Sequence, residues 1–217
     1  MLTGSTKRGS LLLVFLLISS GILVADTIDE IYRQLTAKYD TIENYAADFH
    51  QNNYWKVQDR TMKSNGIVYI SGEKMAIVFT TPSGQKMIVD RELYLIDEVE
   101  RTIIITGIEH TGGMFKPNDI IRLYWMKSER ELINVDDQTY KIILVPEDDP
   151  YTARAEMLIR KGDYLITGVS YEDHQQNRVE FRFSNEVVNR PVDQQVYTVP
   201  KDEDFSIIDS RDNKPRE

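Results

Sequence analysis

Hydrophobic residues recur every three or four positions over residues 27–45, the spacing of one face of an α-helix. The stripe consists of Ile28, Ile31, Leu35, Tyr39 and Ile42. Thr27 stands before it and Glu30 three residues later, which is a capping-box pattern for a helix start. The pattern predicts one amphipathic helix over residues 27–45.

After this helix the pattern changes to period two, which is typical of half-buried strands. In residues 178–183, Val179, Phe181 and Phe183 alternate with charged residues. Other strand-like runs are 68–70, 75–79, 101–107, 139–145 and 153–160. Short polar turns such as 82–84 and 161–163 separate the runs, which favours hairpins. We therefore expect a mainly β (α+β) fold with a single antiparallel sheet.

One segment in the middle of the chain departs from this pattern. Gly112 and Gly113 predict a flexible, hinge-like loop, and residues 119–126 read as a short apolar helix that starts near Pro117. A sheet that is apolar on one face must cover that face. Two helices provide modest cover for so many strands, so either the sheet curls on itself or a cavity remains.

The N-terminus has the layout of a secretory signal peptide. Lys7 and Arg8 precede the apolar run 11–18, and small residues follow. We expect residues 1–25 to be the signal peptide, with cleavage after about Gly21 or Ala25; an uncleaved anchor is the alternative. Residues 26–209 then form one domain, and residues 210–217 form a polar tail.

Composition narrows the classes of function. The formal net charge of −9 disfavours a nucleic-acid partner, and the absence of cysteine excludes thiol chemistry. Motifs of the common hydrolases, nucleotide-binding proteins and metalloproteases are missing. His50, His110 and His174 are scattered, so no metal site is expected. The sequence therefore predicts a protein that is not an enzyme and has no cofactor.

Residues 44–51, NYAADFHQ, contain a histidine and an aspartate that resemble a catalytic cluster. Period-two alternation instead predicts a strand with one apolar side. That side carries Tyr45, Ala47, Phe49 and Gln51. Because Asp48 and His50 then point the other way, the stretch is better interpreted as the wall of a container.

Large apolar side chains are the remaining signal, and several are methionines, which adapt to irregular shapes. They are Met75, Ile77, Phe79, Met87, Met114, Phe115, Trp125 and Met126. Each one alone is most simply a core residue. Together they indicate the lining of a cavity between the sheet and the helices.

The order of these motifs resembles the LolA type of periplasmic carrier of outer-membrane lipoproteins. The helix and NYAADFHQ are similar to the opening of that family, and a glycine-headed strand follows at Gly66. The further matching stretches are MAIVFTTP (75–82), QKMIVD (85–90), LYLID (93–97) and QQVYTVPKDEDFSIID (194–209). The resemblance covers residues 27–209.

This resemblance implies an unclosed, curved half-barrel capped by the N-terminal helix and a short apolar lid helix. The implied lipid-binding cavity comprises Phe49, Val68, Ile70, Met75, Ile77, Phe79, Met87, Leu93 and Leu95. The implied lid comprises Met114, Phe115, Ile120, Ile121, Tyr124 and Trp125, with its hinge at Gly112 and Gly113. The family takes acylated lipoproteins from an ATP-driven release complex of the inner membrane and passes them to an outer-membrane acceptor. A monomeric periplasmic carrier is expected.

The chain departs from the family at the end of the glycine-headed strand. Where the family commonly has an Arg–Pro pair that bonds to the lid, this chain has Ser71, Gly72 and Glu73. Lid closure must therefore be held differently or weakly. An envelope sensor, or a binding protein for glycolipid or free lipid, is the alternative use of the same half-barrel.

Overall fold

The computed structural model describes residues 27–108, 124–201 and 205–211. The predicted signal peptide, the predicted hinge, His110 and most of the predicted lid helix lie outside these ranges.

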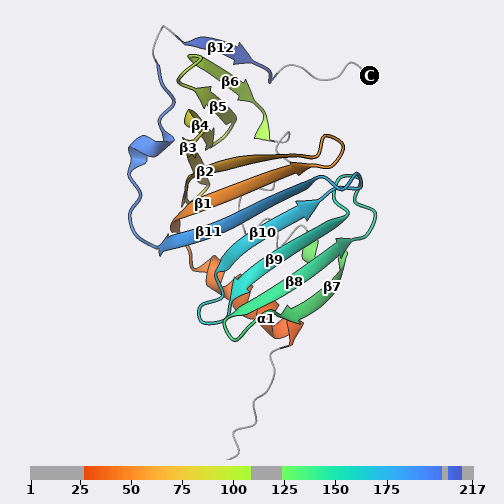
Figure 1. Ribbon diagram of the computed structural model, residues 1–217. Coiled ribbons are helices and arrows are strands. Elements are labelled where there is room, and N and C mark those ends of the chain that lie inside the picture. The colour runs from red at the N-terminus through yellow and green to blue at the C-terminus, as the bar shows by residue number, and fades with distance from the viewer. Residues whose placement is uncertain (1–26, 109–123, 202–204, 212–217) are drawn as a thin grey trace, which may run out of the picture.

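The strands form one twisted sheet with a helix on one side (Figure 1). The elements of the first half are α1 (Ile28–Asp40), β1 (Asn44–Trp55), β2 (Arg60–Ser71), β3 (Lys74–Thr81), β4 (Ser83–Val89), β5 (Leu93–Asp97) and β6 (Thr102–Thr106). The second half has β7 (Ser128–Asn134), β8 (Thr139–Pro146), β9 (Arg154–Arg160), β10 (Ile166–Glu172), β11 (Arg178–Val188), the short 3-10 helix η2 (Gln194–Tyr197) and β12 (Ser206–Asp209).

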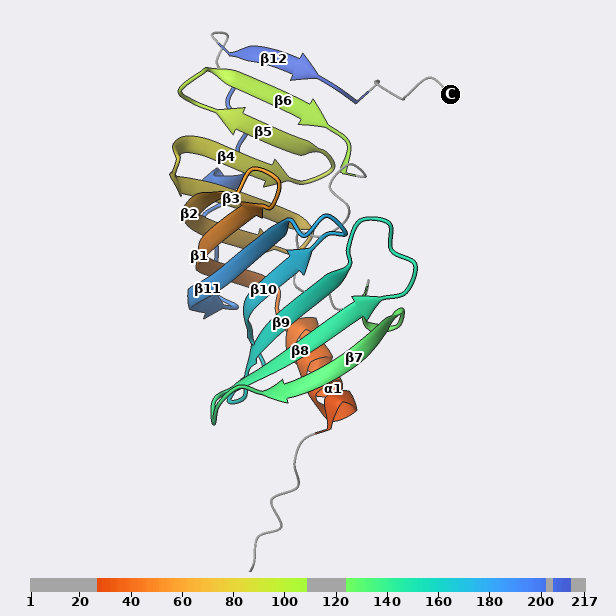
Figure 2. The same cartoon turned by 45° about the vertical axis from the view of Figure 1, so that its right-hand side comes forward.

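The sheet is open, with β12 at one edge and β7 at the other. The strand order is β12-β6-β5-β4-β3-β2-β1-β11-β10-β9-β8-β7 (Figure 2). This confirms the predicted mainly β, unclosed architecture. The expectation of an entirely antiparallel sheet is wrong at one pairing, because β12 runs parallel to β6. The chain crosses the sheet after β11 and returns in the direction of β6, so no hairpin joins the two.

Helix α1 begins as predicted and ends earlier. The Thr27 side chain accepts a hydrogen bond from the Glu30 N–H at 3.2 Å. At the other end, the Thr41 hydroxyl donates to the Lys38 carbonyl at 2.7 Å, which closes the last turn. The chain then enters β1, where it pairs with both β2 and β11. The Thr41 cap and the start of this pairing therefore end the helix at Asp40. Within the described ranges, no helix is long and apolar enough to cross a membrane.

Helix α1 packs on one face of the sheet, which we call the inner face. Ile31, Leu35 and Tyr39 contact the inward side chains of β8, β9 and β10, and we call this group the α1 cluster. The Tyr39 hydroxyl accepts a hydrogen bond from the Ile166 N–H at 3.0 Å, which links the helix to the start of β10. Many of these sheet residues, such as Met157, have no exposed surface. This half of the inner face is a conventional core.

The outer face has two different coverings. Over β3 to β6, the segment 190–201 crosses the strands and buries a second apolar group, which we call the outer cluster. Its buried members are Ala76, Ile88, Ile96, Ile103 and Tyr197. Over β8 to β11, charged side chains replace the apolar ones; Glu156 pairs with Lys141 at 3.4 Å and with Arg154 at 2.9 Å. The sheet is therefore apolar on both faces at β3 to β6 only.

Candidate functional site

Two rows of side chains cross β1 to β6 on the inner face. Antiparallel pairing in direct register places one residue from each strand opposite the next. The first row is Ala47, Val68, Ile77, Met87, Leu95 and Ile104. The second row is Tyr45, Ile70, Met75, Val89, Leu93 and Thr106. We call the apolar side chains gathered here the β1–β6 cluster; all nine residues predicted for the cavity belong to it.

A glycine makes room for an aromatic pair at one end of this cluster. Phe49 and Phe79 meet edge to face, with ring centroids 5.6 Å apart and planes at 88°. Gly66 lies between them in the ladder. A Cβ on Gly66 would stand 2.2 Å from the Val78 carbonyl oxygen and 2.8 Å from a Phe49 ring carbon. Only glycine fits there, which explains the glycine-headed strand seen in the sequence.

Burial falls across the β1–β6 cluster. Met75 is 1 % exposed and Leu93 6 %, whereas Phe79, Met87 and Leu95 are only half-buried. The half-buried side chains border a cavity of about 330 Å³. Its lining residues are Phe79, Gln85, Lys86, Met87, Leu95, Ile96, Asp97, Thr102 and Ile104. The second row is therefore packed, and the hollow lies beside the first row over β4, β5 and β6.

The far end of the cavity is polar. The Gln85 side-chain amide donates to Asp97 at 3.1 Å, and the other carboxylate oxygen of Asp97 accepts from the N–H groups of Val99 and Glu100. The bond from Glu100 and the bond from Gln85 lower the pKa of Asp97 below its usual value. Asp97 therefore stays ionised and holds the β5–β6 turn through its hydrogen bonds. Its negative charge lies where the apolar surface of the cavity ends.

Tyr45 brings an unpaired hydroxyl into the β1–β6 cluster. Its side chain is 3 % exposed, and no described residue hydrogen-bonds its hydroxyl. Burial raises the pKa of Tyr45 well above the usual value for tyrosine, so the hydroxyl stays protonated. An unpaired buried hydroxyl is costly, and a polar atom of a ligand would relieve that cost.

The predicted lid is described at its last two residues only. Met114, Phe115, Ile120 and Ile121 lie outside the described residues, as do Gly112 and Gly113. Tyr124 and Trp125 are helical and buried in the α1 cluster, away from the β1–β6 cluster. Trp125 stacks on Tyr32 of α1 with ring centroids 4.3 Å apart, and the Tyr124 hydroxyl bonds the Thr152 hydroxyl at 2.9 Å. The described end of this segment is thus fixed to α1 and β8–β10.

The histidines do not form a chemical site in the described ranges. His50 lies on the outer side of β1, where its ring nitrogen Nδ1 is hydrogen-bonded to Asn65. His174 is hydrogen-bonded to the Asp149 carbonyl at 2.7 Å in a turn. Among residues 27–108, 124–201 and 205–211, no group of three His, Asp or Glu side chains is arranged to hold a metal ion. NYAADFHQ is accordingly a strand whose inward positions, Tyr45 and Phe49 among them, are buried.

Sequence reasoning missed several residues of the site. Val89 and Ile104 extend the two rows, and Gln85, Asp97 and Thr102 form the polar end. The period-two signal was available for Val89, which follows Met87 by two residues. Phe181 and Phe183 of β11 flank the cluster beside Phe49. The sequence predicted them only as apolar positions of an alternating strand. Their place at the site follows from the pairing of β11 with β1, which is remote in sequence.

Comparison with known proteins finds similarity in structure alone. No family model and no curated protein matches the chain. An uncharacterized conserved protein from Thermus thermophilus is similar at 11 % identity and a TM-score of 0.55, over 83 % of this chain and 98 % of that chain. The similar structures include a LolA superfamily protein from Nitrosomonas europaea, at 11 % identity and a TM-score of 0.43, over 81 % of this chain and 99 % of that chain. They also include the Mycobacterium tuberculosis lipoprotein LppX, at 12 % identity and a TM-score of 0.45, over 77 % of this chain and 99 % of that chain. The likeness is one of fold, and the family that the sequence motifs resemble is among the structures found.

Proposed function

We propose that the protein is a carrier that holds the acyl chains of outer-membrane lipoproteins against the β1–β6 cluster and shuttles them between the two membranes. One observation supports this above all: the nine predicted cavity residues share one face, and three of the half-buried ones, Phe79, Met87 and Leu95, border a cavity of about 330 Å³. An acyl chain is the ligand whose shape and polarity suit a row of Met, Leu, Ile and Phe side chains.

The energetics suit a carrier that must also release its cargo. Each CH₂ group removed from water contributes about 0.8 kcal/mol, so an acyl chain of a dozen or more carbons is held firmly by apolar contact alone. The half-buried side chains Phe79, Met87 and Leu95 would lose their remaining exposure when such a chain covers them. Because the contact is apolar and carries few directional bonds, the chain can leave along the same surface.

The remaining parts of the proposal concern place and partners. The carrier would act in the periplasm as a monomer after export through the signal peptide of residues 1–25. It would receive acylated lipoproteins from an ATP-driven release complex of the inner membrane and deliver them to an outer-membrane acceptor. Gly112 and Gly113 would form the hinge of a lid that includes Met114, Phe115, Ile120 and Ile121. No catalysis and no cofactor are involved.

The change Phe79→Glu tests the cavity. A carboxylate placed among Met87, Leu95 and Ile104 opposes an entering acyl chain, so binding of a fluorescent fatty-acid probe should fall by about tenfold or more. Thr80→Glu is the matched control, because Thr80 is the next residue and is exposed. The control should bind the probe like the parent. Equal binding by both variants would reject the cavity as the binding site.

The identity of the cargo needs a separate experiment. The protein should be purified from the native periplasm and its bound molecules identified by mass spectrometry. Co-purification of an acylated lipoprotein supports the carrier. Co-purification of free phospholipid or glycolipid instead would replace the carrier with a lipid-binding protein or a sensor that uses the same cavity.

A further inference from the structure

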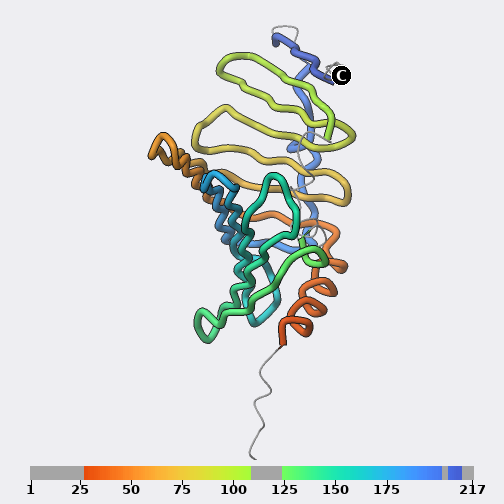
Figure 3. The backbone as a smooth tube through the Cα atoms, turned by 90° about the vertical axis from the view of Figure 1, so that its right-hand side faces the viewer, coloured from red at the N-terminus to blue at the C-terminus, as the bar shows by residue number. Residues whose placement is uncertain are grey.

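The β1–β2 hairpin extends beyond β3 on one side, while β11 accompanies it on the other. On the β3 side, pairing of β2 stops at Asn65, opposite Thr81, so residues 60–64 run past the end of β3. Figure 3 shows this hairpin (orange) projecting away from the neighbouring strands. On its other side the hairpin is held by β11, and the Lys56 N–H donates to the Asn177 side chain at 3.0 Å. The hairpin is therefore held by β11 and the β10–β11 turn along one side, and β3 leaves its other side uncovered.

Three large apolar side chains are exposed on this hairpin. Trp55 is 44 % exposed, Val57 at the turn is 89 % exposed, and Met62 is 48 % exposed. Asn53 pairs with Met62 in the ladder, so Trp55 and Met62 lie on the same side of the hairpin. That side is the inner face, which Phe49 also occupies further along β1. Single exposed apolar residues are common on protein surfaces, but three in eight residues form a local patch.

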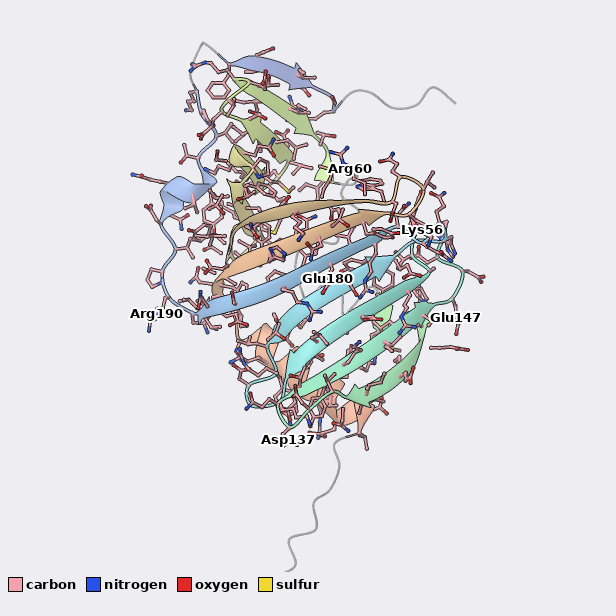
Figure 4. All side chains as sticks on the ribbon, viewed as in Figure 1. Lys56, Arg60, Asp137, Glu147, Glu180 and Arg190 are labelled. Atoms are coloured by element: carbon pink, nitrogen blue, oxygen red, sulfur yellow. The ribbon has the colours of Figure 1, made fainter. Side chains whose placement is uncertain are left out.

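The same hairpin is positively charged on an acidic chain. Residues 54–63 contain Lys56, Arg60 and Lys63 against Asp59, which leaves a charge of +2, whereas the whole chain carries −9. All four side chains are exposed, and Figure 4 labels Lys56 and Arg60 near the end of the hairpin. In the part of the chain that the structure describes, none of the three cations makes an ion pair. Their charge is available to a partner.

Two acidic side chains in the hairpin turn and in the neighbouring turn are engaged in local hydrogen bonds. Asp59 accepts a hydrogen bond from the Tyr54 hydroxyl at 3.2 Å. In the adjacent β10–β11 loop, Asp173 accepts hydrogen bonds from the backbone N–H and the side-chain amide of Asn177. These bonds, with others in the loop, lower the pKa of Asp173. These local bonds keep the carboxylates within their turns.

We propose that the β1–β2 hairpin, residues 54–63, is a docking surface for an anionic lipid bilayer. Tryptophan favours the interface of a bilayer, and Val57 and Met62 would enter the acyl boundary beside it. Lys56, Arg60 and Lys63 would lie at the level of the headgroups and neutralise their phosphates. The charge of the hairpin complements an anionic membrane and is opposite to that of the chain as a whole.

The position of the hairpin relates the docking surface to the β1–β6 cluster. Trp55 and Met62 continue the inner face that holds Phe49 and Phe79, so the docked hairpin would connect the bilayer surface with the β1–β6 cluster. Docking itself does not require the proposed cargo. The two proposals can therefore fail separately.

Co-sedimentation with vesicles tests the docking surface. The full chain should sediment with vesicles of phosphatidylethanolamine and phosphatidylglycerol, and much less with vesicles of phosphatidylcholine. The triple variant Lys56→Gln/Arg60→Gln/Lys63→Gln and the triple variant Trp55→Ser/Val57→Ser/Met62→Ser should each weaken sedimentation by about tenfold or more. Added salt should weaken the binding of the parent.

A matched control removes three cations elsewhere. Arg91, Arg190 and Lys201 are exposed, and Figure 4 places Arg190 at the opposite end of the strands from Lys56. The variant Arg91→Gln/Arg190→Gln/Lys201→Gln should sediment like the parent. The chain has two tryptophans, and Trp125 is 1 % exposed, so a blue shift of fluorescence on vesicle binding should disappear in Trp55→Phe.

Several outcomes would overturn the docking surface. They are failure of the parent to sediment with the anionic vesicles, equal sedimentation with phosphatidylcholine, and equal loss in the control variant. Binding to polyglutamate in place of vesicles would overturn it too and would point to an acidic protein partner. Fatty-acid probe binding without vesicles should be unchanged in the hairpin variants, which separates this test from that of the cavity.

Discussion

The two halves of the inner face are built from the same kind of strand but are covered differently. Over β8, β9 and β10, α1 fills the space, and side chains such as Met157 and Ile159 have no exposed surface. Over β4, β5 and β6, the corresponding positions Met87, Leu95 and Ile104 remain half-buried beside a cavity. Both halves present apolar side chains on the inner face. What differs is whether another element of the described chain covers the apolar side.

This difference indicates that the two halves of the inner face contribute differently to stability and to ligand contact. The covered half stabilises the fold, because complete burial of aliphatic side chains contributes most of the free energy of folding. The open half keeps apolar surface that a ligand can use. The comparison can be tested by removing similar side chains from each half.

The largest effect is expected from Leu35→Ala in α1. Leu35 has no exposed surface and packs against the sheet, so its truncation should lower the free energy of unfolding by about 2–5 kcal/mol. Leu95→Ala in the open half removes the same atoms beside an existing cavity and should cost less than about 1.5 kcal/mol. Urea denaturation of both variants measures the difference. Similar losses would show that the two halves are equally packed.

A second test concerns the packed end of the open half. Gly66→Ala places a Cβ against the Val78 carbonyl and the Phe49 ring, so the strands must move apart at a cost of about 1–3 kcal/mol. Gly162→Ala is the control, because its Cβ would meet nothing within 4 Å. Its effect should stay within about 0.5 kcal/mol in thermal unfolding. An unchanged stability of the Gly66 variant would mean that the Phe49–Phe79 contact tolerates separation.

The smallest effect is expected at the edge of the open half, where β12 pairs with β6. Arg211 donates to the Asp209 carboxylate and to Glu92 of the β4–β5 turn, and the bond from Arg211 lowers the pKa of Asp209 to about 2. The folded pKa is below the unfolded value of about 3.9, so this contribution is complete above that value and is lost as the pH falls towards 2. Hydrogen-exchange protection of residues 206–209 should decrease slightly over this range. Asp209→Asn should show no such decrease, and a decrease of equal size in that variant would assign the effect to another group.

The sequence predicted the parts of the fold that depend on local patterns. Helix α1 and its Thr27 cap follow from the three- and four-residue spacing, and the inward residues of β1, β3, β9 and β11 follow from strict alternation. The end of α1 was misplaced, because Ile42 continues the apolar stripe but serves as a contact between the two inner clusters instead. Pattern reasoning could not weigh the strand pairing that takes over at Asn44.

Other parts depend on partners that are remote in the chain. Nothing in residues 206–209 shows that this short strand joins β6 in parallel rather than in a hairpin. Likewise, Ala76, Ile88 and Ile96 alternate with the cavity residues and read as the solvent side, yet they are buried beneath residues 190–201. That the nine residues predicted for the cavity share one face could be inferred from alternation, because each lies an even number of positions from the others in its strand.

The outer cluster has a consequence for the order of folding. Strands β3 to β6 form consecutive hairpins whose local contacts can assemble early. Their outer side chains, including Ile88 and Ile103, are buried only when residues 190–201 and Phe205 arrive near the end of the chain. Until then the nascent sheet carries uncovered apolar surface on both sides, which favours aggregation. A chain that lacks its last thirty residues should therefore accumulate as insoluble protein, although every strand from β1 to β10, and β11 except for Val188, is still encoded.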